Sequence, residues 1–326
     1  MSFVAILIAL LLEQARPVGR GNAMHVSLRA WVTWCGSTFD AGKEHHAWLA
    51  WAFAVVLPSV AVMLVYWLLA AFAGWPFAVF WNIAVLYFAL GFRQFSHHFT
   101  EIRDALNAGD EPRARELLAR WRQVDASGLA RSDIVRQVVE HSVLSAHRHV
   151  FGVLTWFSVL AVLGLGPLGA VMYRLSEYVP RYWTSEKARR VHPVSPALAG
   201  VAQRMWWWLD WVPARVTAVG FAVVGSFEDA IDCWRNYERQ GSVTNDGVIL
   251  ASTSGAINIR LGSLQRAMQT GSMQSVPGGA EELPFSSAAG SEAEVGHLRV
   301  VVGLVWRTVV MWMVLLALLS LARLLG

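Results

Sequence analysis

The chain has 326 residues, of which 55% are hydrophobic and 15% charged, with 27 Lys and Arg against 23 Asp and Glu. An average soluble domain is about 25% charged, so this composition favours a membrane protein. The two cysteines, Cys35 and Cys233, lie far apart without a CxxC spacing, which argues against a disulfide scaffold, a zinc site or an iron–sulfur site. We assign the basic excess to the loops of a membrane protein and expect no nucleic-acid partner.

The N-terminal region predicts a short anchor followed by a transmembrane hairpin. Residues 1–12 are apolar but shorter than the ~20 residues of a full span, and they lack the basic start of a signal peptide. We therefore expect a retained, tilted or half-inserted anchor. Residues 48–73 carry no charge and predict a transmembrane helix kinked at Pro58. After a turn at 74–76, residues 77–92 return across the membrane, with aromatic side chains near the ends.

Residues 93–149 have a different character, because they contain nine arginines and an amphipathic pattern. Gly109 ends a first helix and Asp110 caps a second one, and a third helix runs over about Ser132–His149. The arginines place this helical region in the cytoplasm by the positive-inside rule. The apolar side chains that recur at helical spacing are Ile102, Leu106, Ala114, Leu117, Leu118 and Trp121.

The next apolar segment, residues 150–172, is interrupted by Gly164, Gly166, Pro167 and Gly169. It predicts either a clean span or a broken, re-entrant element. Residues 174–204 are basic, and residues 205–226 predict a further membrane segment. The sequence leaves open on which side of the membrane the following polar stretch lies.

The C-terminal part predicts a polar loop region over 228–298, flexible over 268–297, and a last span over 299–325. We therefore predict an all-α, polytopic helical protein of about four to five spans, in the bacterial inner membrane, with a cytoplasmic helical region. A homo-oligomer stays open. The predicted segments are 1–92, 93–149, 150–227, 228–298 and 299–326.

Five separated pieces of the sequence together indicate a family. They are ALNAGDEPRARELL (105–118), VVEHS (138–142), GPLGAVMYR (166–174), DWVPARVTA (210–218) and SGAINIRLG (254–262). These pieces resemble the CobD/CbiB superfamily and occur in the order that the superfamily has them. This superfamily includes membrane enzymes that form amides in cobalamin assembly and the AmpE proteins linked to β-lactamase regulation. The resemblance covers most of the chain, although no single piece is specific.

Departures from the enzyme pattern make the AmpE branch the closer resemblance. The enzymes usually follow the VES element with a Glu-Asn pair and an Asp-Gly pair, where this chain has LSAHRHVFG. They also carry an aspartate near the position of Pro180. In contrast, HRHVFGVLTWF and LDWVPAR are similar to AmpE proteins. The resemblance thus implies a protein that has lost the ancestral chemistry.

Asp210 and Arg215 are candidate ligand-binding residues because they lie within a predicted membrane segment. An ionisable side chain there costs roughly 2.5–3.5 kcal/mol at the helix centre. Around Pro213, the two side chains could line one cavity. The alternative is that they pair with each other or extend to the interface, where the neighbouring tryptophans 206–208 are also expected.

Two further candidates, Arg93 and His97, are one helical turn apart and could together contact an anionic ligand or lipid headgroups. Glu140 is a candidate because it belongs to the VVEHS element. With His141, His147 and His149 it could suggest a metal site, but the spacing lacks the His-x-x-x-His pattern of a helical pair. We expect surface or interfacial histidines and no metal site.

Arg260 lies between Gly255 and Gly262, a context that suits close approach to phosphate or carboxylate groups. Docking of the loop onto the helices is the alternative. Asp110 and Arg115 are expected to be structural, as a helix cap and a helix-to-neighbour contact. The sequence has no P-loop and no dinucleotide-binding motif. It assigns no catalytic residue and no cofactor with certainty.

Three functions compete. The first is an AmpE-like membrane protein with a sensing or regulatory role, which would bind a cell-wall-derived small ligand. The second is an enzyme that resembles adenosylcobinamide-phosphate synthase and joins an aminopropanol-type amine to a corrinoid carboxylate; the resemblance then implies ATP, Mg²⁺ and a corrinoid. The third is a transporter or lipid-handling protein. In each case the lipid bilayer is a partner, and the first is the main prediction.

Overall fold

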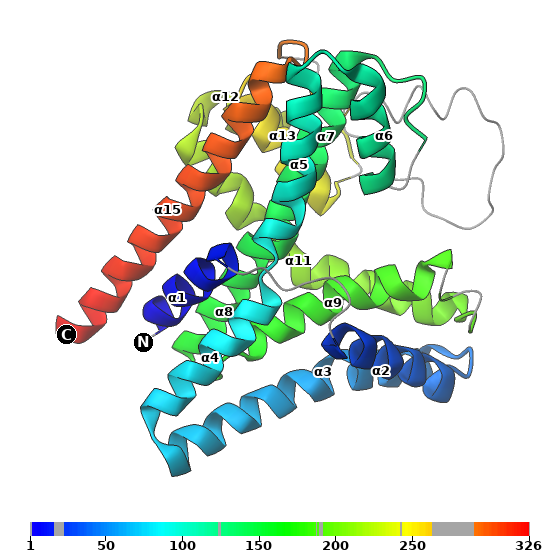
Figure 1. Ribbon diagram of the computed structural model, residues 1–326. Coiled ribbons are helices and arrows are strands. Elements are labelled where there is room, and N and C mark those ends of the chain that lie inside the picture. Colours follow the sequence, from blue (N-terminus) through cyan, green and yellow to red (C-terminus); the bar gives the residue numbers. More distant parts are fainter. Residues whose placement is uncertain are drawn as a thin grey trace. The chain divides into compact units, whose positions relative to one another are not determined.

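A computed structural model describes residues 2–15, 23–122, 125–186, 188, 192–241, 243–262 and 290–325 (Figure 1). These residues are helical apart from turns, loops and one isolated β-bridge between Ile259 and Ser291, so the predicted all-α fold is confirmed. The chain forms two compact units, each made of separate stretches. The first comprises Met1–Phe92, Arg148–Pro213 and Leu316–Gly326, and the second Arg93–His147 and Ala214–Leu315. The five segments predicted from the sequence stay a prediction, because each of the two units combines stretches from several of them.

The first unit is built on a long hairpin with shorter helices packed against it. A turn at Gly74, whose φ of 93° lies in the left-handed region, reverses the chain between α3 and α4. Its helices are α1 (Ser2–Ala15), α2 (Ala23–Phe39), α3 (Glu44–Leu68) with a π-helical turn (Leu69–Ala73), α4 (Trp75–Ala89), α8 (Gly152–Val162), α9 (Leu168–Thr184) and the first part of α11 (Pro196–Val224).

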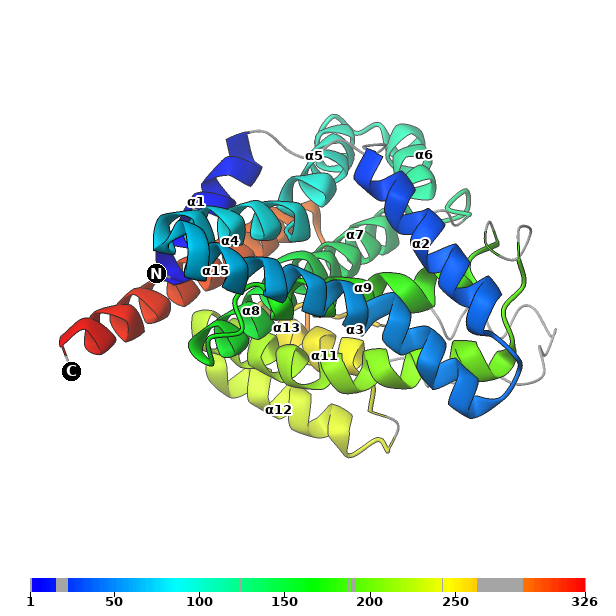
Figure 2. The same cartoon turned by 90° about the horizontal axis from the view of Figure 1, so that it is seen from below.

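The core of the first unit lies where α2, α3, α9 and α11 meet (Figure 2). Trp183 fills it and donates its indole N–H to the carbonyl of Val32 at 3.1 Å. At the edge of this core, Ser195 donates both its backbone N–H and its hydroxyl to the Asp40 carboxylate, at 2.6 Å each. The apolar contacts and these hydrogen bonds therefore tie together helices that are far apart in the sequence.

The predicted break in the third apolar segment is present. α8 ends at Val162, and α9 begins at Leu168 after a turn in which Gly164 and Gly166 have positive φ angles. α9 then packs closely on α8, because a Cβ on Gly169 would lie 2.2 Å from the carbonyl oxygen of Trp156. The glycine and proline cluster thus produces two short packed helices rather than one span.

The second unit contains the arginine-rich helices. Its elements are α5 (Phe92–Asn107) from Arg93 on, α6 (Glu111–Arg122), α7 (Arg131–Ala146) with the first residue of the π-helical turn that follows (His147–Phe151), the second part of α11, α12 (Phe227–Glu238), α13 (Asn245–Ala256) and α15 (Val295–Leu325) up to Leu315. α12 and α13 form a close hairpin, because Gly225 and Gly255 allow contacts that a Cβ would block. Most of the predicted flexible loop, 268–297, lies outside the described residues, and Val295 already begins α15.

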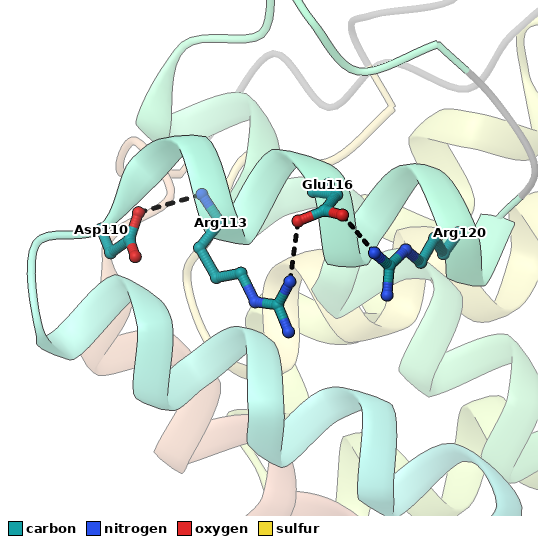
Figure 3. Close-up of polar contacts among 4 residues, drawn as sticks. All are labelled: Asp110, Arg113, Glu116 and Arg120. Atoms are coloured by element: carbon teal, nitrogen blue, oxygen red, sulfur yellow. Dashed lines mark hydrogen bonds and ion pairs between the residues drawn. The ribbon is translucent and has the colours of Figure 1, made fainter.

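The start of α6 follows the prediction. Gly109, with a φ of 77°, ends the preceding helix, and the Asp110 carboxylate accepts the backbone N–H of Arg113 at 3.0 Å. Further along the exposed face, Glu116 pairs with both Arg113 and Arg120 (Figure 3). The hydrogen bond from Arg113, together with the charge of Arg120, lowers the pKa of Glu116. Asp110 is therefore a structural helix cap.

Two helical segments within the described residues are long and apolar enough to cross a membrane, Glu44–Ala73 and Val295–Ala322. Both expose many large apolar side chains, such as Phe72 with 86% of its surface exposed. The apolar helices Phe3–Ala15 and Trp75–Ala89 are shorter. Length and composition thus identify two candidate spans.

The other predicted spans are not helices that are both long and apolar enough to cross a membrane. Residues 150–172 are divided by the break before α9. Residues 205–226 belong to the longer helix α11, which begins at Pro196 and includes the charged Arg204, Asp210 and Arg215. The prediction of four to five full spans therefore stays a prediction.

Substituting Gly152 tests the close packing of the first unit. A Cβ at this position would lie 2.1 Å from the ring of the fully buried Tyr173, and overpacking of this kind costs about 1–3 kcal/mol. We expect Gly152→Ala to lower the thermal unfolding temperature of the detergent-solubilised protein. Gly200→Ala is the matched control, because a Cβ on Gly200 meets open space. Equal unfolding temperatures for the two variants would contradict this packing.

Candidate functional site

The structure divides the predicted site residues between the two units. Asp210 belongs to the first unit, whereas Arg93, His97, Glu140, Arg215 and Arg260 belong to the second. Arg93 and His97 lie in α5, but their side chains are outside the described part of the structure, and their ligand contact stays a prediction. The remaining residues form one polar cluster around Glu140, one contact at the start of α13 and one buried pair at Asp210.

Glu140 is the centre of the polar cluster in the second unit. It lies on α7 with 18% of its side chain exposed, and its Oε1 accepts the backbone N–H of Gly262 at 2.7 Å. The Nε of Arg136, one turn earlier, lies 3.8 Å from the same oxygen. Arg136 also pairs with Asp133 at 2.7 Å. Burial raises the pKa of Glu140, against the opposing effects of the Gly262 hydrogen bond and the Arg136 charge.

The loop that follows α13 is fixed by hydrogen bonds on both sides of Arg260. The Ser254 hydroxyl donates to the carbonyl of Ile259 at 2.8 Å, and the backbone N–H of Arg260 donates to the carbonyl of Ser291 at 2.9 Å. Gly262 has a φ of 86°, a conformation that glycine adopts at little cost. The loop thereby holds its backbone against Glu140 two residues after Arg260.

The side chain of Arg260 is exposed, and among the described residues its guanidinium makes a long hydrogen bond, 3.4 Å, to the carbonyl of Gly290. An exposed guanidinium can bind a carboxylate or phosphate through two parallel hydrogen bonds. The nearby Glu140 is held by a backbone N–H and by Arg136. The cluster thus combines a positioned cation for an anionic group with a carboxyl group whose pKa is raised.

Arg215 contacts α13. Its Nη1 lies 3.3 Å from the Oδ1 of Asn245, the first residue of that helix, which Thr244 caps through the N–H of Gly247. Arg215 and Asp210 thus have hydrogen-bond partners on different helices. That the two side chains line one cavity stays a prediction.

Asp210 is buried, with 1% of its surface exposed, and accepts a hydrogen bond from the Tyr173 hydroxyl at 2.8 Å. The ring of Trp206 lies 5.3 Å from that of Tyr173, and Gly152 leaves the space that the Tyr173 ring occupies. Hydrogen bonding of this kind compensates for the cost of burying a carboxylate. The buried pair anchors α9 to α11, while Trp208 on the same helix is exposed.

The histidines do not form a metal site in the part of the chain that the structure describes, because no group of three His, Cys, Asp or Glu side chains there could hold a metal ion. His141 packs edge-on against Trp121, with 4.4 Å between ring centroids. The prediction of surface or interfacial histidines is wrong for His147. It is fully buried and its Nδ1 lies 2.9 Å from the Thr217 hydroxyl, because the π-helical turn directs it into the second unit.

Two residues that sequence reasoning missed are Tyr173 and Arg136. Arg136 precedes Glu140 by four residues, and helical spacing alone could have placed it beside that carboxylate. Tyr173 lies in the GPLGAVMYR piece of the resemblance, yet its contact with Asp210 spans 37 residues. No local pattern in the sequence indicates a pairing at that distance.

Comparisons with known proteins agree with one another. The family described as CobD/Cbib protein matches residues 4–293. Cobalamin biosynthesis protein CobD of Stutzerimonas stutzeri is 31% identical over 275 residues, which cover 84% of this chain and 82% of that protein. The protein of the same name from Chromobacterium violaceum is 31% identical over 180 residues, covering 55% of this chain and 54% of that protein. No solved structure matches the chain.

The raised pKa of Glu140 predicts a pH dependence of stability. At a pH between the ordinary carboxyl pKa of about 4.5 and the raised pKa, Glu140 of the folded protein keeps a proton that the unfolded chain has lost. The free energy of unfolding therefore falls as the pH rises from about 4.5 through the raised pKa. Glu140→Gln removes this proton while keeping an acceptor for Gly262. We expect the unfolding temperature of the variant, relative to wild type, to increase over this range.

Glu116→Gln is the matched control, because its carboxylate has a lowered pKa. Wild type should lose stability relative to this variant only as the pH falls below about 4.5. A difference between Glu140→Gln and wild type that stays constant with pH, or that decreases as the pH rises, would contradict the burial of Glu140.

The buried pair predicts an energetic coupling between Tyr173 and Asp210. Tyr173→Phe removes a donor to a buried carboxylate, and hydrogen bonds to charged groups are worth about 1.5–3 kcal/mol. Measured by denaturant or thermal unfolding, the cost should be smaller when the same substitution is made in an Asp210→Asn background, which removes the charge of the acceptor. Additive effects in this double-mutant cycle would show that the pair does not stabilise the first unit.

Proposed function

Because the chain belongs to the CobD/CbiB family, we propose that it is a membrane enzyme of cobalamin biosynthesis. The main support for this proposal is the similarity to the Stutzerimonas stutzeri protein, which is named for cobalamin biosynthesis and matches 84% of the chain. The AmpE-like regulatory role, which the local motifs favoured, gains no support from these relatives. The second sequence hypothesis therefore becomes the proposal: a corrinoid carboxylate is joined to an aminopropanol-type amine as an amide.

The polar cluster around Glu140 supports this chemistry through charge. Corrinoid carboxylates, and a phosphate on the amine or on a nucleotide, are anionic, and positioned arginines stabilise such groups where charge accumulates. Arg260 is the residue we assign to this contact, because its guanidinium is exposed on a loop fixed at both sides. Glu140 and Gly262 act as positioning groups for that loop.

A carboxylate must be activated before an amine can displace its oxygen, and the resemblance implies a nucleoside triphosphate for this purpose. The described residues do not fit a Mg²⁺ site, since no cluster of three ligating side chains is present among them and Glu140 already accepts the Gly262 N–H. We derive no step through magnesium. What the chain supplies in this proposal is the binding and orientation of anionic groups.

We also propose that the protein is embedded in the bacterial inner membrane by more than one pass. The two candidate spans support this placement. The aromatic side chains Trp48 and Trp67 are exposed near opposite ends of the first span, about 28 Å apart along the helix axis. This separation is close to the ~30 Å thickness of a hydrocarbon core, and aromatic residues favour its two interfaces.

Substituting Arg260 tests the proposed activity. Purified full-length protein would be supplied with adenosylcobyric acid, aminopropanol or its phosphate, ATP and Mg²⁺, and the amide product measured by mass spectrometry. Loss of a charge-assisted contact worth about 1.5–3 kcal/mol should reduce kcat/KM about 10- to 100-fold in Arg260→Ala. Arg260→Lys should recover part of the rate, because lysine keeps the charge but not the two-pronged geometry.

Arg235→Ala is the control, because it removes an exposed arginine from α12 of the same unit. It should keep the wild-type rate. If wild-type protein that is folded forms no product, the enzymatic proposal fails; if Arg260→Ala keeps full activity, the assignment of Arg260 fails.

A further inference from the structure

The first unit contains an arginine cluster that the proposed function does not use. Arg174 and Arg181 on α9 flank Glu177, with Nη1 to carboxylate distances of 3.2 Å and 2.7 Å. From α2, the guanidinium of Arg29 lies beside the hydroxyl of Tyr178. α2 and α9 are also joined by the Thr33 and Tyr182 hydroxyls, 2.7 Å apart. We call Arg29, Arg174 and Arg181 the α2–α9 arginine cluster.

Among the described ion pairs of this cluster, the charges do not balance. Glu177 is buried, with 2% of its side chain exposed, and a single carboxylate needs only one cation to neutralise it. The second arginine and Arg29 leave a surplus of positive charge. Arg181 is 57% exposed, Arg29 is also exposed, and each guanidinium has five N–H donors. Donors are therefore available to an anion from outside the protein.

The position of the cluster indicates what that anion is. Leu175, Val179 and Trp183 of α9 pack against the first turns of α3, from Ala47 to Val55. The candidate span Glu44–Ala73 has 30 residues, so it is about 45 Å long and exceeds the ~30 Å hydrocarbon core. The N-terminal end of the span, before Trp48, therefore extends into the headgroup region. Because α9 packs against this end of α3, we place the cluster near the level of the phospholipid phosphates.

Aromatic side chains around the same end of α3 support this level. Trp34 contacts Phe39 edge-on, and Phe39 stacks on Phe53 with 4.6 Å between ring centroids. Trp34, Trp48 and Phe53 are exposed. Such side chains favour the interface between the hydrocarbon core and water. The basic composition of 174–204 assigns this end to the cytoplasmic leaflet, which carries the anionic lipids.

We propose that the α2–α9 arginine cluster binds the phosphate of an anionic phospholipid in the cytoplasmic leaflet. Arg29 and Arg181 donate to the phosphate oxygens, while Arg174 keeps Glu177 neutralised. The inference rests on the membrane placement proposed above and not on the corrinoid chemistry. A bound lipid would fix α2 against α9 at the membrane surface.

The test measures which lipids the purified protein retains. Full-length protein would be delipidated, equilibrated with mixed micelles of equal phosphatidylcholine and phosphatidylglycerol, re-purified and extracted. We expect phosphatidylglycerol to be enriched about five- to thirtyfold over phosphatidylcholine, the range expected for one to two arginines near an anionic surface. R29Q/R181Q should return the ratio to that of the micelles, while keeping the Arg174–Glu177 pair.

R113Q/R120Q is the matched control, because it removes the same charge from two exposed arginines that share Glu116 (Figure 3). It should keep the enrichment. Arg29→Gln alone leaves both ion pairs of Glu177 and should give an intermediate ratio, which keeps the test valid should the double variant not fold.

The outcomes separate the possible failures. Enrichment in wild type that R29Q/R181Q retains, or that R113Q/R120Q also loses, would overturn the assignment to this cluster. If wild type retains the two lipids in the ratio of the micelles, the lipid site is overturned and the membrane placement stands. If wild type retains neither lipid, the membrane placement itself is contradicted. If inorganic phosphate at low concentration abolishes the enrichment, the cluster binds a free phosphate and the lipid assignment is overturned.

Discussion

The cost of burying a carboxylate constrains this structure more than any other single demand. An ionised carboxylate that leaves water without partners is destabilised by several kcal/mol. Among the described residues, several carboxyl groups are buried or largely buried, and three of these lie on α7, α9 and α11. Asp210 accepts a hydrogen bond from Tyr173, Glu177 pairs with two arginines, and Glu140 accepts a backbone N–H from Gly262. The contacts of Asp210 and Glu140 join segments that are far apart in the sequence. The contacts of Glu177 hold two arginines of the same helix.

Glycine makes two of these contacts possible. The Tyr173 ring reaches Asp210 through space that a side chain on residue 152 would fill, and Gly262 has a backbone conformation that other residues rarely adopt. Next to Gly262, the fixed loop presents Arg260 with its side chain exposed. On α9, the buried Glu177 pairs with the exposed Arg181.

Local features of this fold could be predicted from the sequence, whereas long-range pairings could not. The amphipathic spacing placed Ile102, Leu106 and Leu118 in the core, where they are fully buried, and the cap at Asp110 follows from residue type and position alone. These features depend on neighbours within a few residues. The partners of Asp210, Arg215 and His147 lie on other helices, and only the tertiary fold brings them together.

The functional interpretation shows the same limit. Short pieces such as LDWVPAR favoured a regulatory role, but a few residues carry little information about chemistry, and the match over 84% of the chain points to cobalamin biosynthesis. The structure adds that LDWVPAR includes an aspartate buried against Tyr173 and an arginine that contacts Asn245 at the start of α13. Both contacts are structural in kind, so this motif does not by itself distinguish a regulator from an enzyme.

Binding of a corrinoid tests the central claim most directly, because it requires no assumption about the activating nucleotide. Folded, detergent-solubilised protein would be mixed with adenosylcobyric acid and passed through gel filtration, with the corrinoid absorbance followed across the protein peak. The proposal predicts co-elution at about one equivalent for wild type, weakened at least about tenfold in Arg260→Ala. Absence of co-elution, from wild-type protein shown to be folded in the same experiment, would contradict a role in corrinoid chemistry.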